Sequence, residues 1–281
     1  MTLLIVGGSG FLGAELVRQA VAAGHRTAAT YATGRPPGST PAVVWHALDL
    51  RDPGRAEAVV AEVAPRAVVN ASSGGADWAV TAEGPVRLAR AAAACGSRLV
   101  HVSSDAVFSG ASGLPYDESC PPDPLTPYGA AKAAAETGVR LVHPGAVVAR
   151  TSLIIGDGQS GQSGHERVVH ELAAGTRTGA LFTDDVRCPV HVTDLAAALL
   201  ELASGDATGM HHLGGAEALS RHELGVLIAR RDGLDHSRLP TGLRADSSVP
   251  GALDVRLDSR ATQRGLRTRL RGAHQFLSSG A

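Results

Sequence analysis

The chain has 281 residues and carries 26 lysines and arginines against 27 aspartates and glutamates, so its net charge is −1. This length suffices for one large domain, or for one domain with a smaller lobe. The basic residues are scattered along the sequence, which excludes a general polyanion binder, and we expect no nucleic-acid partner.

No apolar run reaches the roughly 18 residues that a membrane-spanning helix needs. Residues 1–16 are apolar, but they lack a basic start and contain four glycines, unlike a secretory signal. The three cysteines form no CxxC pair and the 12 histidines are dispersed, so neither a disulfide frame nor a metal site is predicted. These features predict a cytoplasmic protein without a membrane partner.

Strand and helix patterns alternate in the first half of the chain. Residues 2–6 form an apolar run followed by glycines, which is typical of a strand buried on both faces, and residues 11–23 have helical periodicity. Asp52 is expected to cap a helix that extends to residue 64, because Pro53 suits the first helical position. The alternation predicts an α/β fold with a doubly wound, parallel Rossmann-type sheet. The other predicted strands are 27–31, 43–48, 67–70, 98–103 and 145–151, and the other helices are 84–94 and 127–140.

After residue 153 the pattern changes. Residues 156–164 are rich in Gly, Ser and Gln and are predicted to form a loop. Helices are expected at 165–174, at 195–202 after a cap at Asp194, from Ser220 to 231, and after Asp258, with strands at 189–193 and 210–213. We therefore predict a dinucleotide-binding domain over 1–153 and a smaller, C-terminal substrate-binding lobe over 154–281, with 189–209 packed back on the first domain.

A glycine motif lies between the first predicted strand and the first helix. Gly7 permits a tight turn, Gly10 lets the backbone approach a pyrophosphate, and Gly13 lets the helix pack close to the strand. The N–H groups at the start of the helix, at Phe11 and Leu12, are available to phosphates, and the helix dipole favours the negative charge. This motif predicts binding of a nicotinamide dinucleotide.

A second motif combines a tyrosine with a lysine. Tyr128 and Lys132 are four residues apart in a predicted helix and therefore share one of its faces. A neighbouring cation stabilises phenolate, which makes Tyr128 a usable general acid for protonating the alkoxide formed when hydride reaches a carbonyl. Ser104 ends a predicted strand, at the sheet edge where ligands bind, and is placed to donate a hydrogen bond to the substrate oxygen.

These motifs, in this order, resemble the extended short-chain dehydrogenase/reductase family. The patterns are Gly-x-x-Gly-x-x-Gly from Gly7, Ser-Ser-Asp-x-Val-Phe from Ser103 and Tyr-x-x-x-Lys from Tyr128. The resemblance is strongest to the dTDP-4-dehydrorhamnose reductase branch and covers nearly the whole chain. It implies that Ser104, Tyr128 and Lys132 are the catalytic set and that Lys132 also holds the nicotinamide ribose. Further similar segments are 101–110, 116–118, 127–129, 150–152 and 192–195.

The resemblance also assigns cofactor contacts. It implies that Asp49 and Leu50 contact the adenine and that Ala71 and Ser72 lie along the cofactor. The second predicted strand ends without an acidic residue, and Arg35 follows it, so a 2′-phosphate would be accepted. We therefore expect NADP(H) to be preferred and NAD(H) to be possible. The alternative is that Arg35 points into solvent from a Pro-Gly loop.

The substrate is expected to be a sugar nucleotide, and Asp105, Arg167 and Arg187 are assigned to it. The two guanidinium groups suit bidentate recognition of a diphosphate, although a solvated surface role is as consistent with the sequence for each. Ala106 and Leu153 stand where related sugar reductases often carry a tyrosine and a tryptophan that contact the sugar. These differences weaken the assignment to one particular sugar.

The sequence thus predicts an NAD(P)H-dependent reductase of a carbonyl, namely the 4-keto group of a nucleotide-linked deoxysugar. Thr81, which stands where a helical asparagine is usual in the family, leaves the hydride chemistry intact. An epimerase or dehydratase on the same fold is one alternative, although Asp105 is followed by Ala106 where a dehydratase would carry glutamate. The other alternative is a non-catalytic, NADP-binding regulatory subunit. The sequence leaves open whether the chain forms a homodimer.

Overall fold

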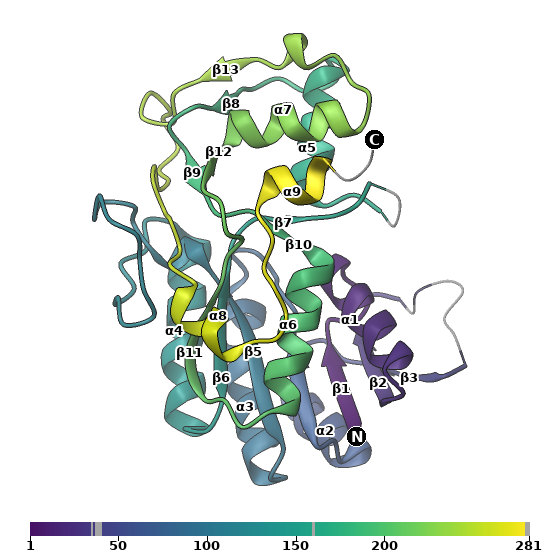
Figure 1. The fold of residues 1–281 in the computed structure, drawn as a ribbon. Coiled ribbons are helices and arrows are strands. Elements are labelled where there is room, and N and C mark those ends of the chain that lie inside the picture. Colours follow the sequence, from purple (N-terminus) through teal and green to yellow (C-terminus); the bar gives the residue numbers. More distant parts are fainter. Residues whose placement is uncertain (35, 37–40, 159–160, 279–281) are drawn as a thin grey trace. The chain divides into compact units, whose positions relative to one another are not determined.

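The computed structural model describes residues 1–34, 36, 41–158 and 161–278 (Figure 1). The chain divides into two compact units, each made of several segments. The sequence-based division at residue 153 differs from this arrangement at 105–126, which the structure assigns to the second unit. The segment 196–211 belongs to the first unit and overlaps residues 189–209, which we expected to pack back on the first domain. The first unit comprises Met1–Ser104, Pro127–Arg150 and Ala196–His211, and the second comprises Asp105–Thr126, Thr151–Leu195 and His212–Ala281.

A seven-stranded sheet is the centre of the first unit, in the order β11-β6-β5-β4-β1-β2-β3. β1 pairs in parallel with β2 and β4, and the pairs β2–β3 and β4–β5 are also parallel. The doubly wound, parallel sheet expected from the sequence is therefore confirmed. The strands are β1 (Thr2–Val6), β2 (Arg26–Tyr31), β3 (Val43–Ala47), β4 (Ala67–Asn70), β5 (Arg98–Ser104), β6 (Val147–Thr151) and β11 (Gly209–Leu213).

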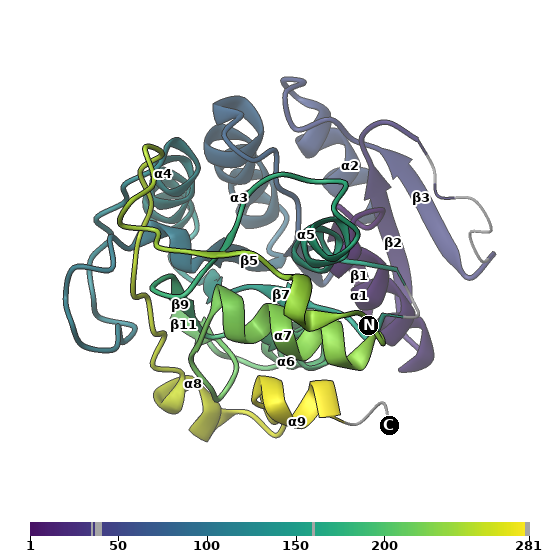
Figure 2. The ribbon, with the colours of Figure 1, turned by 90° about the horizontal axis from the view of Figure 1, so that it is seen from above.

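Helices cover both faces of this sheet. α2, α3 and α4 lie on one face, while α1 and the part of α6 that belongs to this unit lie on the other (Figures 1 and 2). The expected cap at Asp52 is wrong, because α2 begins only at Arg55, after a left-handed Gly54 with φ of 78°. The bounds are α1 (Phe11–Ala22), α2 (Arg55–Val63), the π-helix η1 (Ala79–Glu83), α3 (Gly84–Ala94), α4 (Pro127–Val142) and α6 (Val192–Ser204).

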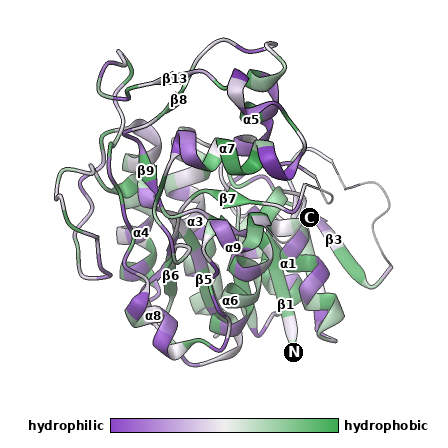
Figure 3. Ribbon diagram, turned by 45° about the horizontal axis from the view of Figure 1, so that its top comes forward, coloured by the Kyte–Doolittle hydropathy of each residue, from purple (hydrophilic) through white to green (hydrophobic). Residues whose placement is uncertain are grey.

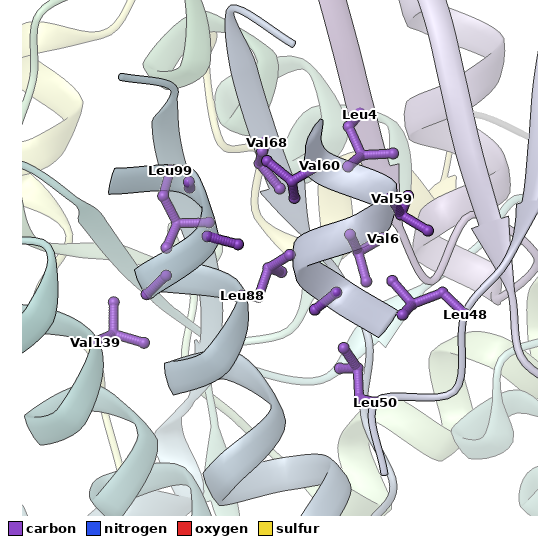
Figure 4. Packing of buried hydrophobic residues seen from close by; sticks show 14 of the residues in the cluster. Leu4, Val6, Leu48, Leu50, Val59, Val60, Val68, Leu88, Leu99 and Val139 are labelled. Carbon is purple, nitrogen blue, oxygen red and sulfur yellow. The ribbon is translucent and has the colours of Figure 1, made fainter. Parts of the chain in front are cut away.

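Apolar side chains fill the space between the sheet and α2–α4. Leu4 and Val6 of β1 and Val68 of β4 face Val60 of α2 and Leu88 of α3 (Figure 4). Alternate residues of a strand point to opposite faces, so a strand covered on both faces must be apolar throughout. The central strands are accordingly hydrophobic along most of their length (Figure 3).

The second unit has its own apolar core, in which Leu172, Leu224, Ile228 and Phe276 are buried among other aliphatic side chains. Ser220 caps α7 with Glu223 in a reciprocal capping box, as the sequence predicted for the start of this helix. Asp194 is not a cap, because α6 begins two residues before it. The elements are η2 (Asp105–Val107), β7 (Ile154–Ile155), α5 (Gly164–Ala173), β8 (Leu181–Phe182), β9 (Val186–Arg187), β10 (Val190–His191), β12 (Leu219–Ser220), α7 (Arg221–Arg231), η3 (His236–Arg238), β13 (Thr241–Gly242), α8 (Arg260–Gly265) and α9 (Ala273–Ser278).

The strand order fixes where a ligand can bind in the first unit. The chain runs outward in one direction through β2 and β3 and in the other through β4, β5 and β6, so the order reverses between β1 and β4. Ligands of open α/β sheets bind outside the carboxyl ends of the strands at such a point. The glycine turn after β1, the loop after β4 and Ser104 at the end of β5 all lie at this edge. Among the described helices, none is long and apolar enough to cross a membrane.

Candidate active site

The turn after β1 is built from backbone that leaves no room for side chains. Gly7 has φ of 79°, and a Cβ on it would lie 2.9 Å from both the Cα and the N of Ser72. A Cβ on Gly13 would lie 2.0 Å from the carbonyl oxygen of Gly7. Gly7 also donates its N–H to the hydroxyl of Thr30 on β2, at 3.0 Å. These contacts bring the start of α1 against the ends of β1, β2 and β4.

The N-terminus of α1 suits a phosphate. Gly10 is the N-cap residue, and no side chain caps the helix. A Cβ on Gly10 would lie 3.3 Å from the Gly7 carbonyl oxygen, which is a tight contact, so the turn would have to shift slightly to accept a side chain here. The first N–H groups of the helix, which include those of Phe11 and Leu12, lie at this end. The site therefore fits the pyrophosphate of a dinucleotide.

The loop after β4 is held by a buried amide. Asn70 accepts hydrogen bonds at its Oδ1 from the N–H and the hydroxyl of Ser72, at 3.1 and 2.6 Å. Its Nδ2 lies 3.2 Å from Nδ1 of His101, the residue opposite it on β5. Burial, and then the charge of Lys132, lower the pKa of His101 well below its ordinary value. Ala71 and Ser72, assigned to the cofactor from the sequence, thus lie directly beside the glycine turn.

The proposed adenine residues follow β3. Asp49 accepts a hydrogen bond from the N–H of Arg51 at 2.9 Å, while Leu50 is buried in the core between the sheet and α2–α4. Arg87 of α3 donates to the carbonyl oxygen of Leu50 at 2.5 Å, which fixes this loop. Arg35, the proposed 2′-phosphate ligand, lies outside the described residues.

The first turns of α4 carry the tyrosine and the lysine. Tyr128 is partly exposed and Lys132 is 3% exposed, and the Lys132 ammonium lies 6.0 Å from the centre of the Tyr128 ring. Lys132 donates to the carbonyl oxygen of Val102 on β5 at 3.0 Å. The structure therefore places Lys132 against the strand that ends at Ser104, and Tyr128 one helical turn before Lys132 on α4.

Burial lowers the pKa of Lys132. Desolvation lowers the pKa of Lys132 to about 8, and the opposing influence of the Glu136 carboxylate raises it. An ammonium with this pKa loses its proton far more readily than an exposed lysine. The lysine can therefore change its charge close to neutral pH.

Sequence reasoning missed a buried ion pair beside this lysine. Glu136 on α4 accepts from both Nε and NH2 of Arg150 on β6, at 3.0 and 2.8 Å, and from the hydroxyl of Ser103 at 2.6 Å. The signal was present, because Glu136 follows Lys132 by one helical turn and so shares its face. The partners on β5 and β6 could not be identified from spacing.

Thr81, the departure from the family pattern, has a structural role. It lies in the π-helix η1 and is buried. Its hydroxyl donates to the carbonyl oxygen of Gly75 at 2.8 Å and accepts from the N–H of Gly74 at 3.1 Å. Thr81 thus closes the loop that runs from Ser72 to η1.

In the second unit, Asp105 and Arg187 form part of a polar network. Asp105 is buried, accepts from the Ser152 hydroxyl at 2.6 Å and lies 3.7 Å from Nε of Arg187. Arg187 also pairs with Asp185 at 2.9 Å and donates to the carbonyl oxygen of Ala252 at 2.9 Å. A diphosphate would have to compete with these protein partners for the guanidinium of Arg187.

Two other arginines of the second unit, Arg221 and Arg167, have surroundings that differ from those of Arg187. Arg221 lies 3.3 Å from Asp185 and 3.2 Å from Nδ1 of His165, a pair that the sequence did not reveal. Burial, followed by the charge of Arg221, lowers the pKa of His165 to about 4. Arg167 is exposed. Among the described residues, no group of His, Cys, Asp and Glu side chains could hold a metal ion.

The chain is similar to characterised proteins over most of its length. Residues 1–252 match the family described as the RmlD substrate binding domain. A dTDP-4-dehydrorhamnose reductase of Mycobacterium tuberculosis is 31% identical over 252 residues, which are 84% of this chain and 77% of the relative. A dTDP-4-dehydrorhamnose reductase structure from Bacillus anthracis, in complex with NADP, has a TM-score of 0.82 at 19% identity and covers 98% of this chain and 96% of its own. The Bordetella bronchiseptica enzyme WbmG, in complex with NAD, has a TM-score of 0.83 at 22% identity, with coverages of 100% and 92%.

Proposed function

Because the chain belongs to the RmlD-like, dTDP-4-dehydrorhamnose reductase branch of the extended short-chain dehydrogenase/reductase family, we propose that it reduces the 4-keto group of a nucleotide-linked deoxysugar with a nicotinamide cofactor. One observation carries the proposal. Tyr128 and buried Lys132 share a face of α4, and Lys132 is bonded to the strand that ends at Ser104, in the unit that holds the glycine turn.

The side chains of the first unit can perform the proton chemistry. The bound dihydronicotinamide supplies the hydride. The hydroxyl of Ser104 donates a hydrogen bond to the substrate carbonyl oxygen and draws electron density from its carbon. Tyr128 gives its phenolic proton to the oxygen as negative charge develops there, and the Lys132 ammonium favours the phenolate that remains. Lys132 also holds the nicotinamide ribose in this proposal.

The cofactor would lie across the carboxyl edge of the sheet. Gly7 makes the tight turn, Gly13 lets α1 pack close to it, and Gly10 lets the backbone approach the pyrophosphate, which the N–H groups of Phe11 and Leu12 would bind. Asp49 and Leu50 are placed at the adenine, and Ala71 and Ser72 along the middle of the cofactor. The contacts of Ser72 with Gly7 and Asn70 support this path.

We propose NADPH as the preferred form. The described end of β2, up to Gly34, carries no acidic side chain to repel a 2′-phosphate or bind a ribose hydroxyl, and Arg35 follows. The ratio of kcat/KM for NADPH and NADH should favour NADPH by about tenfold or more, and Arg35→Ala should lose most of this preference. A parent enzyme that prefers NADH, or an unchanged ratio in Arg35→Ala, would show that Arg35 does not bind the 2′-phosphate.

Substrate binding is assigned to Asp105, Arg167 and Arg187 in the second unit. Arg167 offers an exposed guanidinium to a diphosphate, and Asp105 directly follows Ser104 in the chain.

The free thiols of the three cysteines support a reducing, cytoplasmic location. A homodimer of this chain can be tested by gel filtration.

The direct test is NADPH oxidation, measured against a panel of nucleotide 4-ketosugars. We expect turnover with at least one of them. No turnover with any member of the panel would refute the sugar assignment. Purified protein that carries stoichiometric NAD⁺ would favour an epimerase, and an unrelated enzyme that co-purifies without reductase turnover would favour a regulatory subunit.

A further inference from the structure

A buried carboxylate lies one helical turn beyond the lysine of the proposed site. Glu136 and Arg150 are each 3% exposed, and their side chains form two parallel, charge-assisted hydrogen bonds. Ser103 adds a third bond to the same carboxylate, at 2.6 Å. Three elements therefore meet at Glu136: α4, which carries it, β5 and β6.

The same two elements, α4 and β5, carry Lys132 and its partner. The ammonium of Lys132 is bonded to the Val102 carbonyl oxygen, and Glu136 is bonded to the side chain of Ser103, the next residue of that strand. Two successive residues of β5 thus hold two successive turns of α4. Movement of either contact would shift the ammonium relative to Tyr128.

Among the described residues, Glu136 is the charge that raises the pKa of Lys132. On β5 the titratable neighbour is His101, whose pKa is lowered well below its ordinary value, so it adds no positive charge at neutral pH. η1 and α3 also pack against α4, and their Glu83 and Arg87 pair with each other at 3.1 Å. Arg90 of α3 and Arg140 of α4 are exposed. Apart from Tyr128 itself and Arg150, which β6 directs at Glu136, the carboxylate of Glu136 is the charge that opposes the cost of burying an ammonium here.

We propose that Glu136, clamped by Arg150 and Ser103, is a positioning residue that keeps Lys132 protonated and seated against β5 for its action on Tyr128. This inference rests on the proposed function of Tyr128 and Lys132. Arg150 supports the charge and the position of Lys132 indirectly, because its guanidinium holds the Glu136 carboxylate ionised and in place. Glu136 itself does not touch the substrate.

Glu136→Gln tests the proposal, because it keeps the shape of the side chain and removes its charge. Without the carboxylate the pKa of Lys132 falls further below about 8, so the alkaline limb of kcat/KM should move to lower pH by about one unit. NADPH affinity, followed by fluorescence against pH, should show the same shift, because Lys132 holds the ribose. The second readout needs no turnover, so it separates this inference from failure of the proposed substrate.

The chain offers a matched control. Glu166 of the second unit is fully buried and pairs with Arg231 at 2.7 Å, and the N–H groups of Gly156 and Ser163, which belong to the same unit, also donate to it. Glu166→Gln should also lower the melting temperature. The alkaline limb of its kcat/KM profile and the pH dependence of its NADPH binding should remain those of the parent. Equal pH profiles for Glu136→Gln and the parent would overturn the proposal, as would an equal shift in Glu166→Gln.

If Glu136→Gln does not fold because Arg150 is left unpaired, the variant Glu136→Gln with Arg150→Met removes the stranded charge. The alkaline limb of this double variant, and its NADPH-binding profile, should still lie below those of the parent in pH. A parent-like profile in a stable double variant would show that the pair serves only to hold the fold together.

Discussion

A phenol and a buried ammonium on one face of α4 are the residues on which the account depends. The carbonyl oxygen of Val102 gives the Lys132 ammonium one polar partner inside the protein, and burial makes its proton labile. A cation near a phenol favours the phenolate, so the same lysine strengthens Tyr128 as an acid. The charge of Lys132 and the acidity of Tyr128 are therefore linked.

Tyr128→Phe tests whether Tyr128 is the general acid. Tyr128→Phe removes the hydroxyl and leaves the ring, so cofactor binding should remain largely intact. Turnover should fall by at least about 10²-fold, the usual contribution of a positioned general acid. Steady-state kinetics with NADPH titrations check both values. Near-normal turnover in Tyr128→Phe would refute the role assigned to this residue.

Lys132→Ala tests whether the ammonium of Lys132 acts on Tyr128 and on the cofactor. In Lys132→Ala the phenolate of Tyr128 loses its stabilising charge, so the pKa of Tyr128 rises and the pH optimum of the reaction should move upward. NADPH affinity should fall as well, because the ribose loses a partner. The pH–rate profile and a fluorescence titration measure the two effects. An unchanged profile together with unchanged affinity would contradict both roles of Lys132.

At the scale of elements, the junction of β1 and α1 is held by close backbone contact. The missing side chain of Gly13 lets α1 approach the Gly7 carbonyl, because a Cβ there would lie 2.0 Å from the oxygen. A Cβ on Gly10 would lie 3.3 Å from the same oxygen, a contact that a small shift relieves. The two glycines therefore serve different purposes, one in packing and the other toward the ligand.

Alanine substitutions should separate these purposes. Gly13→Ala places a Cβ 2.0 Å from the Gly7 oxygen, so it should destabilise the fold by about 1–3 kcal/mol and weaken NADPH binding. Gly10→Ala should weaken NADPH binding with a smaller loss of stability. Gly265→Ala, where nothing lies within 4 Å of the new Cβ, is the control and should change neither property. Equal losses of stability in Gly10→Ala and Gly13→Ala would argue against this division.

Local patterns predicted the elements that carry the site. The apolar run of β1, the glycines after it and the spacing of Tyr128 and Lys132 each depend on neighbours within a few residues, so the sequence alone indicates them. The start of α2 was misplaced because the left-handed Gly54 competes with Asp52 as the entry to the helix. The short strands β7, β8, β9, β12 and β13 contain only two residues each, too few for any periodicity.

At the scale of the whole chain, contacts between distant segments escaped prediction. Glu136 meets Arg150 across 14 positions, and Asp105 meets Ser152 across 47, and no pattern in the sequence specifies either pair. The segment 105–126 leaves the unit that precedes it for the same reason, since its contacts are distant in sequence. The family resemblance supplied the proposed catalytic residues, but it did not supply the partners that hold them.

The proposed function requires that the chain transfer hydride from NADPH to carbon 4 of the sugar. NADPH carrying deuterium at the transferred position of its nicotinamide tests this directly, with a nucleotide 4-ketosugar that supports turnover. We expect one deuterium at carbon 4 of the product sugar for each NADPH oxidised, as measured by mass spectrometry and NMR. A product without deuterium, or sugar conversion without net oxidation of NADPH, would contradict it.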